Sequence, residues 1–130
     1  MTQENFKNTN EPVTLSTGEN LYDLSMLEEM DDNDYLVEIV SIFLHETPKE
    51  LNEMRKAYSD NKADRVYKQA HKLKSSTGII QAKRLSGILT QIEEITKSGK
   101  INDTIFTLIE NAKLGYKKIE TSLQKLLKRY

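Results

Sequence analysis

Hydrophobic residues recur along most of this chain at intervals of three and four positions, which is the spacing of an amphipathic helix. Long helices are predicted over about residues 31–58, 62–80, 82–95 and 103–129. A shorter run with rough helical spacing, residues 21–30, predicts a short helix that covers one end of the core. No stretch shows the alternating pattern of a strand, and no Asn-Gly or Asp-Gly turn indicates a hairpin.

Polar residues mark where these helices begin and end. The acidic and amide side chains of residues 31–34 begin the first long helix, because they satisfy its free N–H groups and complement its dipole. Residues 59–61 offer caps for the second helix, and Ser98 with Gly99 ends the third. Pro48 lies inside the first long helix, but the apolar rhythm resumes in the same phase, so we expect a kink and not an end.

Short connections between long helices favour antiparallel neighbours. The predicted fold is therefore all-α: an antiparallel up-down-up-down four-helix bundle with a short additional N-terminal helix, forming one domain over residues 21–130. Met26, Met30 and Met54 are expected to fill its core. Residues 1–20 are polar and carry too few apolar groups to offset the entropy of ordering, so we expect a flexible N-terminal tail.

The charge balance and the amino-acid composition exclude several classes of function. The 19 basic and 20 acidic side chains nearly balance, so there is no broad positive field for nucleic acid or anionic lipid. The absence of cysteine excludes disulfides, thiolate metal sites and cysteine nucleophiles. No apolar signal region and no run of about 18 apolar residues occurs. We expect a cytoplasmic protein with neither nucleic acid nor membrane as a partner.

The second long helix has two contrasting faces. The inward face is apolar and holds Val66, Ala70, Leu73, Thr77 and Ile80. The other face holds Tyr67, His71, Lys74, Ser75 and Gly78. His71, one of only two histidines, is thus predicted to point outward, with a cation one turn on and small residues beside it. This pattern is typical of a surface that a partner approaches closely, whereas His45 is interpreted as an ordinary surface histidine.

The run Ala70-His71-Lys72-Leu73-Lys74-Ser75-Ser76 resembles the histidine-containing phosphotransfer (HPt) domain of multistep phosphorelays. Phe43-Leu44, Pro48 and Leu51 upstream, and Leu85 and Ile92-Glu93 downstream, extend the resemblance from about residue 21 to the C terminus. It implies that His71 accepts a phosphoryl group from an aspartate of one receiver domain and passes it to an aspartate of another. Lys74 is implied to be a phosphate partner, about 5–6 Å from His71 at the Cβ level.

The resemblance also implies roles for neighbouring residues. Glu93 is similar in position to a residue that bonds the proximal imidazole nitrogen and orients the ring, with Glu94 as the alternative if the helix phase is off by one. Tyr67, Ser75 and Gly78 are predicted to form the receiver docking surface. The family usually has glycine where Ser75 and Gln81 stand. Serine is small, so access should survive, and Gln81 should affect the helix end more than the phosphate.

The phosphoryl transfer expected of His71 requires few catalytic groups from the helical bundle. An exposed imidazole with an ordinary pKa of about 6.5 is mostly neutral at cytosolic pH and is a good nucleophile towards phosphorus. The resemblance implies that magnesium and most of the catalysis come from the receiver, so we predict a carrier and not an enzyme, with no cofactor and no metal. No Glu precedes either histidine by three residues, as a di-metal centre of this fold would require, and no Walker or kinase motif occurs.

The predicted function is therefore a freestanding, monomeric histidine phosphotransfer carrier between the receiver domains of a hybrid sensor kinase and of a response regulator. The first alternative is a helical adaptor that docks receiver or kinase domains without being phosphorylated. The second is a generic helical oligomerisation module, for which His71 would be dispensable. Phosphate acceptance by His71 distinguishes the carrier from both alternatives, and receiver binding without phosphorylation distinguishes the adaptor from the oligomerisation module.

Overall fold

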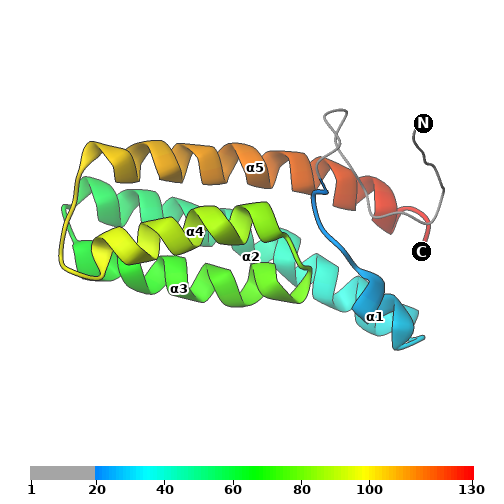
Figure 1. Cartoon of the computed structure of the whole chain (residues 1–130). Coiled ribbons are helices and arrows are strands. Elements are labelled where there is room, and N and C mark those ends of the chain that lie inside the picture. Colours follow the sequence, from blue (N-terminus) through cyan, green and yellow to red (C-terminus); the bar gives the residue numbers. More distant parts are fainter. Residues whose placement is uncertain (1–19) are drawn as a thin grey trace, which may run out of the picture.

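The computed structural model describes residues 20–130, so the predicted tail, residues 1–20, lies outside the described residues apart from Asn20. These described residues form five helices and no strand (Figure 1). The helices are α1 Ser25–Glu29, α2 Asn33–Ser59, α3 Ala63–Ile79, α4 Lys83–Thr96 and α5 Asp103–Leu127. The predicted all-α class is confirmed, and α2 runs through Pro48 as one helix.

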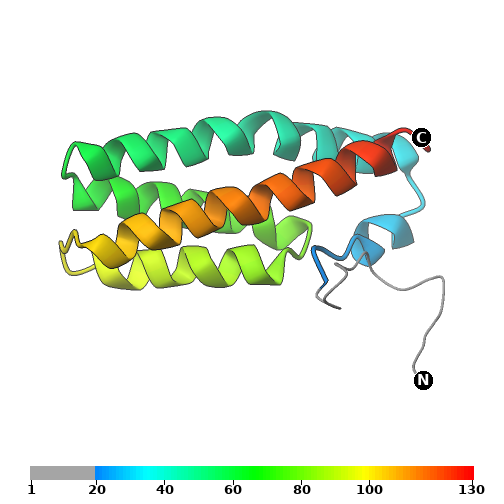
Figure 2. The same cartoon turned by 90° about the horizontal axis from the view of Figure 1, so that it is seen from above.

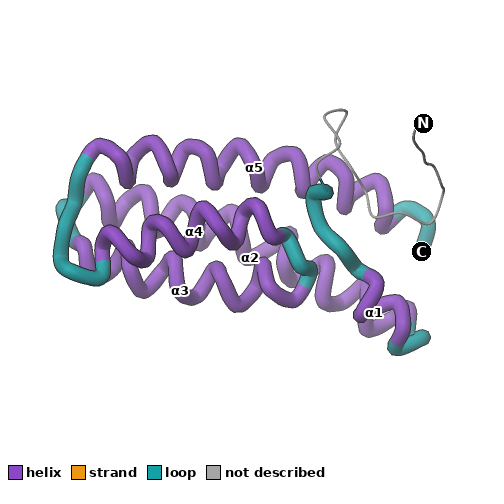
Figure 3. Tube along the Cα trace, viewed as in Figure 1, coloured by secondary structure: helices purple, strands orange, loops and turns teal. Residues whose placement is uncertain are grey.

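The four long helices lie alongside one another and alternate in direction, with their connections at alternate ends (Figure 3). Each contacts two neighbours, in the cycle α2, α3, α4, α5 and back to α2. Figure 2 looks onto α5 and shows α2 and α4 on either side of it. The short helix α1 contacts α2 at the end of the bundle where α3 turns into α4. This is the predicted up-down-up-down bundle with a short additional N-terminal helix.

The core is built from the apolar faces of all five helices. The inward face predicted for α3 is buried, from Val66 to Ile80. Met54 is fully buried, but Met26 and Met30 are 65% and 57% exposed, so the prediction that they fill the core is wrong. The reason is that α1 has only five residues, and such a short helix presents little more than one position, Leu27, to the bundle.

Most of the predicted helix boundaries agree with the structure. Asp32 caps α2 by accepting a hydrogen bond from the backbone N–H of Tyr35 at 3.0 Å, and Asn102 caps α5 in the same way. Residues 59–61 do not cap α3, because its N-cap is Lys62, whose side chain makes no capping bond. Asn61 instead takes a left-handed conformation, with φ 59°, just after α2 ends.

The turn between α3 and α4 sets the geometry of the outward face of α3. Gln81 occupies it with φ 51°, a left-handed conformation that glycine adopts most easily. The backbone N–H of Ala82 donates to the carbonyl of Thr77 at 3.0 Å, and Asp23 N–H donates to the carbonyl of Ile80 at the same distance. Because this turn is short, α4 runs antiparallel along α3. A residue of α3 therefore lies opposite the residue of α4 that is about the same number of positions from the turn.

Candidate functional site

His71 lies on the outward face of α3, with 67% of its side chain exposed. Its neighbours Ala70 and Leu73 are fully buried, because they point into the bundle and hold this turn of α3 in place. The imidazole is therefore carried at the surface by a helix whose opposite face is packed. The predicted outward orientation of His71 is confirmed.

The imidazole Nδ1 of His71 lies 2.5 Å from Oε2 of Glu93, on α4. The other carboxylate oxygen of Glu93, Oε1, accepts a hydrogen bond from Nζ of Lys74 at 2.7 Å. Glu93 is only 8% exposed, so a single buried carboxylate holds both groups that the sequence singled out on α3. The neighbouring Glu94 is exposed, and the structure therefore selects Glu93 as the carboxylate beside the histidine.

The ionisation of Glu93 follows from these contacts. Burial raises the pKa of a carboxyl group, but the hydrogen bonds that Lys74 and His71 donate to Glu93 outweigh that effect and hold its pKa below the usual range. Glu93 is thus an anion at neutral pH. An anion beside Nδ1 favours the tautomer in which Nδ1 carries the proton and Nε2 presents its lone pair.

Tyr67 lies one turn before His71 on α3 and is half-buried. The two rings are stacked, with centroids 6.3 Å apart and planes inclined by 15°. The tyrosine ring therefore lies beside the imidazole and nearly parallel to it.

Ser75 and Gly78, the other two residues predicted for docking, are both exposed. Open space surrounds the position that a Cβ at Gly78 would occupy, since nothing lies within 4 Å of it. Packing inside the bundle therefore does not require a glycine there. The structure brings Tyr67, His71, Lys74 and Glu93 into contact and leaves Ser75 and Gly78 as unobstructed surface. Their docking role stays a prediction.

Sequence reasoning missed a second buried carboxylate nearby. Glu50, on α2, is 8% exposed; its Oε2 lies 3.2 Å from Nζ of Lys72, the residue after His71. Its Oε1 is buried without a hydrogen-bond partner among the described residues. A usable signal was its spacing, because Glu50 falls in the inward phase of α2 between Thr47 and Met54.

Two exposed isoleucines flank this ion pair. A cleft of about 290 Å³ lies between α2 and α3, and Ile42 and Ile79 line it together with Lys72 and Ser76. Ile42 is 51% exposed and Ile79 is 50% exposed. Both lie one step outside the inward phase of their helices, which is the signal by which the sequence could have revealed them. They provide an apolar surface next to the histidine-bearing turns of α3.

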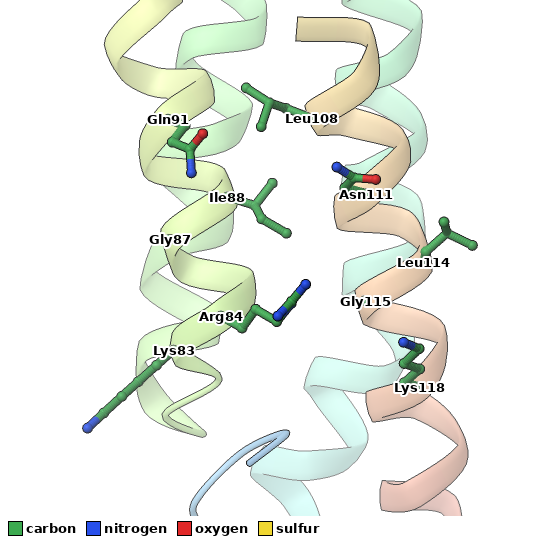
Figure 4. Close-up of a pocket in the computed structure, with 10 residues that line it drawn as sticks. All are labelled: Lys83, Arg84, Gly87, Ile88, Gln91, Leu108, Asn111, Leu114, Gly115 and Lys118. Carbon is green, nitrogen blue, oxygen red and sulfur yellow. The ribbon is translucent and has the colours of Figure 1, made fainter. Parts of the chain in front are cut away.

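A cavity of about 510 Å³ lies elsewhere, between α4 and α5 (Figure 4). Arg84 extends across it from α4 and Lys118 lines it from α5, whereas Lys83 points away. None of the site residues predicted from the sequence lines this cavity. The histidine site is instead an open surface, because 67% of the His71 side chain is exposed.

Within residues 20–130, no cluster of three or more His, Cys, Asp or Glu side chains is arranged to hold a metal ion. In the same residues, no helix is both long enough and apolar enough to cross a membrane.

The Hpt domain family matches residues 38–127, and the chain belongs to this family. The structure is similar to the crystal structure of histidine-containing phosphotransfer protein B (HptB) from Pseudomonas aeruginosa PAO1, with a TM-score of 0.79 and 20% sequence identity. The similarity covers 85% of this chain and 96% of that chain and establishes a shared fold. No curated protein matches the chain. Its class is thus that of the histidine phosphotransfer carriers of phosphorelays, whose partners are receiver domains.

Proposed function

We propose that His71 carries a phosphoryl group from the receiver domain of a hybrid sensor kinase to the receiver domain of a response regulator. The observation that carries this proposal is the exposed imidazole of His71 with its Nδ1 2.5 Å from the buried carboxylate of Glu93. An imidazole held in this way by a carboxylate keeps its proton on Nδ1 and directs Nε2 outward, towards an incoming phosphoryl group.

The reaction is a transfer between two nucleophiles. The lone pair of Nε2 forms a bond to phosphorus as the bond between phosphorus and the aspartyl oxygen breaks, and the aspartate leaves as a carboxylate. The Nδ1 proton stays in place, so the ring becomes positively charged while the carboxylate of Glu93 remains beside it. In the second half of the relay, a carboxylate of the next receiver attacks the same phosphorus and His71 is restored.

Other residues assist this transfer. Lys74, with its Nζ 2.7 Å from Glu93, is close enough to His71 for its ammonium group to reach the phosphoryl oxygens. Tyr67, Ser75 and Gly78 form the docking surface, to which the cleft adds Ile42 and Ile79. The receiver supplies magnesium and the acidic groups that bind it, so this chain is a carrier and not an enzyme. We place it in the cytoplasm as a monomer.

The direct test is to incubate the protein with phosphorylated receiver domains and to measure its intact mass. The wild-type protein should gain one phosphoryl group that is labile in acid and stable in base, whereas His71→Gln should gain none. His45→Gln is the matched control, because His45 is 62% exposed on α2 and also contacts a carboxylate, with its Nδ1 3.0 Å from Glu46. The control variant should be labelled like the wild type.

The alternatives give different results in the same experiment. An adaptor would bind the receivers and remain unlabelled, and its binding would survive His71→Gln. A generic oligomerisation module would neither bind the receivers nor become labelled. Labelling of His71→Gln to the wild-type extent would move the phosphorylation site away from His71 and overturn the proposal.

A further inference from the structure

The cavity of about 510 Å³ between α4 and α5 has different chemistry at its two ends (Figure 4). Two amide side chains, Gln91 and Asn111, lie towards one end, and Ile88 projects between the helices on the same side. Two cationic side chains, Arg84 and Lys118, lie towards the other end. The lining is therefore neutral at one end, partly amide and partly apolar, and positive at the other.

No acidic residue lines this cavity, although the whole chain has 20 acidic and 19 basic side chains. Acidic residues of the same two helices contact other parts of the bundle. Glu93 of α4 bonds His71 on α3, and Glu110 of α5 lies 3.9 Å from Arg55 on α2. The cavity thus has a local excess of positive charge in a chain that is almost neutral.

The positive end of the cavity coincides with the start of α4. Arg84 lies in the first turn of this helix, which contains no acidic side chain, and the N-cap Ala82 makes no side-chain capping bond. The positive end of the helix dipole disfavours a cation at this position and favours an anion. A bound anion would therefore stabilise an arrangement of charges that is otherwise unfavourable.

Two glycines also line the cavity, Gly87 on α4 and Gly115 on α5. Glycine inside a helix costs stability relative to alanine. A Cβ at either position would meet nothing within 4 Å, so packing inside the bundle does not require a glycine at either place. The missing side chains leave room for a ligand to lie against the backbone of both helices.

We propose that this cavity binds a nucleotide, with its phosphate between Arg84 and Lys118 and its base at the amide end. Guanidinium and ammonium groups bind phosphate oxygens, and the amides of Gln91 and Asn111 can each donate to and accept from the edge of a base. Gln91 lies two turns along α4 from Arg84, roughly 10 Å away, which is about the length of a mononucleotide. The cavity volume of about 510 Å³ falls in the range of about 300–1,000 Å³ that is usual for small-molecule sites.

This inference does not rest on the proposed function, because neither His71 nor Glu93 lines the cavity. The first experiment is an NMR titration of the full chain with AMP and with GMP. Either nucleotide should shift the amide resonances of Gly87 and Gly115. Adenosine and inorganic phosphate should each bind at least about tenfold more weakly than AMP, because each occupies only one end of the cavity. Phosphate that bound as tightly as AMP would reveal a simple anion site and overturn the inference.

The second experiment removes the positive charges. Arg84→Gln combined with Lys118→Gln should weaken AMP binding by at least about tenfold, because two charge-assisted contacts to the phosphate are lost. Lys117→Gln is the matched control, since Lys117 is the adjacent residue of α5, is 75% exposed and does not line the cavity. It should bind AMP nearly as the wild type does. Equal losses in the two proteins would indicate unspecific attraction to a positive surface and overturn the inference.

The third experiment fills the cavity. Gly115→Leu should abolish AMP binding, whereas Gly115→Ala, which adds a single methyl group, should weaken it less. Both variants should remain folded by circular dichroism, because a Cβ at this position meets no other atom of the bundle within 4 Å. Wild-type AMP binding by a folded Gly115→Leu would place the nucleotide elsewhere and overturn the inference.

The same variants separate this inference from the proposed function. Gly115→Leu should still accept a phosphoryl group on His71 from a phosphorylated receiver at the wild-type rate. A protein that binds AMP in the cavity but accepts no phosphoryl group would support the nucleotide site and reject the proposed function. A protein that accepts the phosphoryl group but shows no AMP-dependent shifts at Gly87 and Gly115 would do the reverse.

Discussion

The hydroxyl oxygens of Thr77 on α3 and Ser86 on α4 lie 2.6 Å apart. Thr77 is fully buried, and its hydroxyl also donates to the carbonyl of Lys74 at 3.1 Å, which leaves Ser86 to donate to Thr77. This pair joins the two helices between the α3–α4 turn and the histidine site. It helps to hold the register of the helices that places Glu93 opposite His71.

Thr77→Val should lower the free energy of unfolding by about 1 kcal/mol, because it keeps the shape of the side chain but removes the hydrogen bonds of a buried hydroxyl. Urea denaturation measures this change. Thr121→Val is the control: Thr121 is exposed on α5 and bonds only the carbonyl of Lys117 among the described residues, so its substitution should have little effect. Equal losses in the two variants would contradict a special role for the Thr77–Ser86 pair.

The ionised Glu93 should make stability depend on acidity. Because its pKa is lowered in the folded protein, its contribution is fully present above the unfolded carboxyl pKa of about 4.3 and disappears as pH falls through the lower, folded value. The difference in unfolding free energy between the wild type and Glu93→Gln should therefore be largest near neutral pH and shrink below about pH 4. Urea denaturation at several pH values tests this, with the exposed Glu94→Gln as control. A difference that did not vary with pH would contradict the prediction.

Gln81→Gly should stabilise the protein by about 1 kcal/mol, since residue 81 has φ 51° and a side chain with a Cβ is strained in this region. Gln91→Gly is the matched control within α4, where glycine should instead destabilise by about 1 kcal/mol. Thermal or urea unfolding compares the two. Destabilisation by both substitutions would mean that contacts of the Gln81 side chain outweigh the strain of its backbone.

Ile79→Ala should slow phosphoryl transfer from a receiver by about tenfold at low receiver concentration, because the loss of one apolar contact costs about 1–1.5 kcal/mol of docking energy. The rate at saturating receiver should change much less. Leu114→Ala serves as control, as Leu114 is 63% exposed on α5 and lines the separate cavity between α4 and α5. Equal effects of the two substitutions would show that Ile79 is not part of the docking surface.

Ser75→Tyr should reduce phosphoryl transfer by more than about tenfold without unfolding the bundle, because a large ring one turn from His71 obstructs the approach of the receiver. Ser75→Gly should transfer at nearly the wild-type rate, while lowering stability by about 0.5 kcal/mol through its poorer helix propensity. Kinetics and urea denaturation of both variants provide the test. Full transfer by Ser75→Tyr would show that the partner does not pass over residue 75.

Local sequence predicted the helices well because helical hydrogen bonds join residues four positions apart, and a repeating apolar face is visible in the chain itself. It also predicted that His71 points outward, since Ala70 and Leu73 fall in the inward phase. The errors came where the character of a side chain disagreed with the local backbone structure. Met26 and Met30 have apolar side chains, but α1 is too short to bury them. Similarly, Asn61 has the side chain of a cap but takes the left-handed turn after α2.

By itself the sequence thus determined the helical bundle, its topology and the outward face of α3 that carries the histidine. Only the tertiary structure decided which charges meet: that Glu93 and not Glu94 bonds His71, that the same carboxylate also bonds Lys74, and that Glu50 is buried beside Lys72. These pairs join residues of different helices, and their contact depends on how far each helix is shifted and rotated against the next. Core packing and the short turn at Gln81 set that register, and neither is encoded in the spacing of charged residues along one helix.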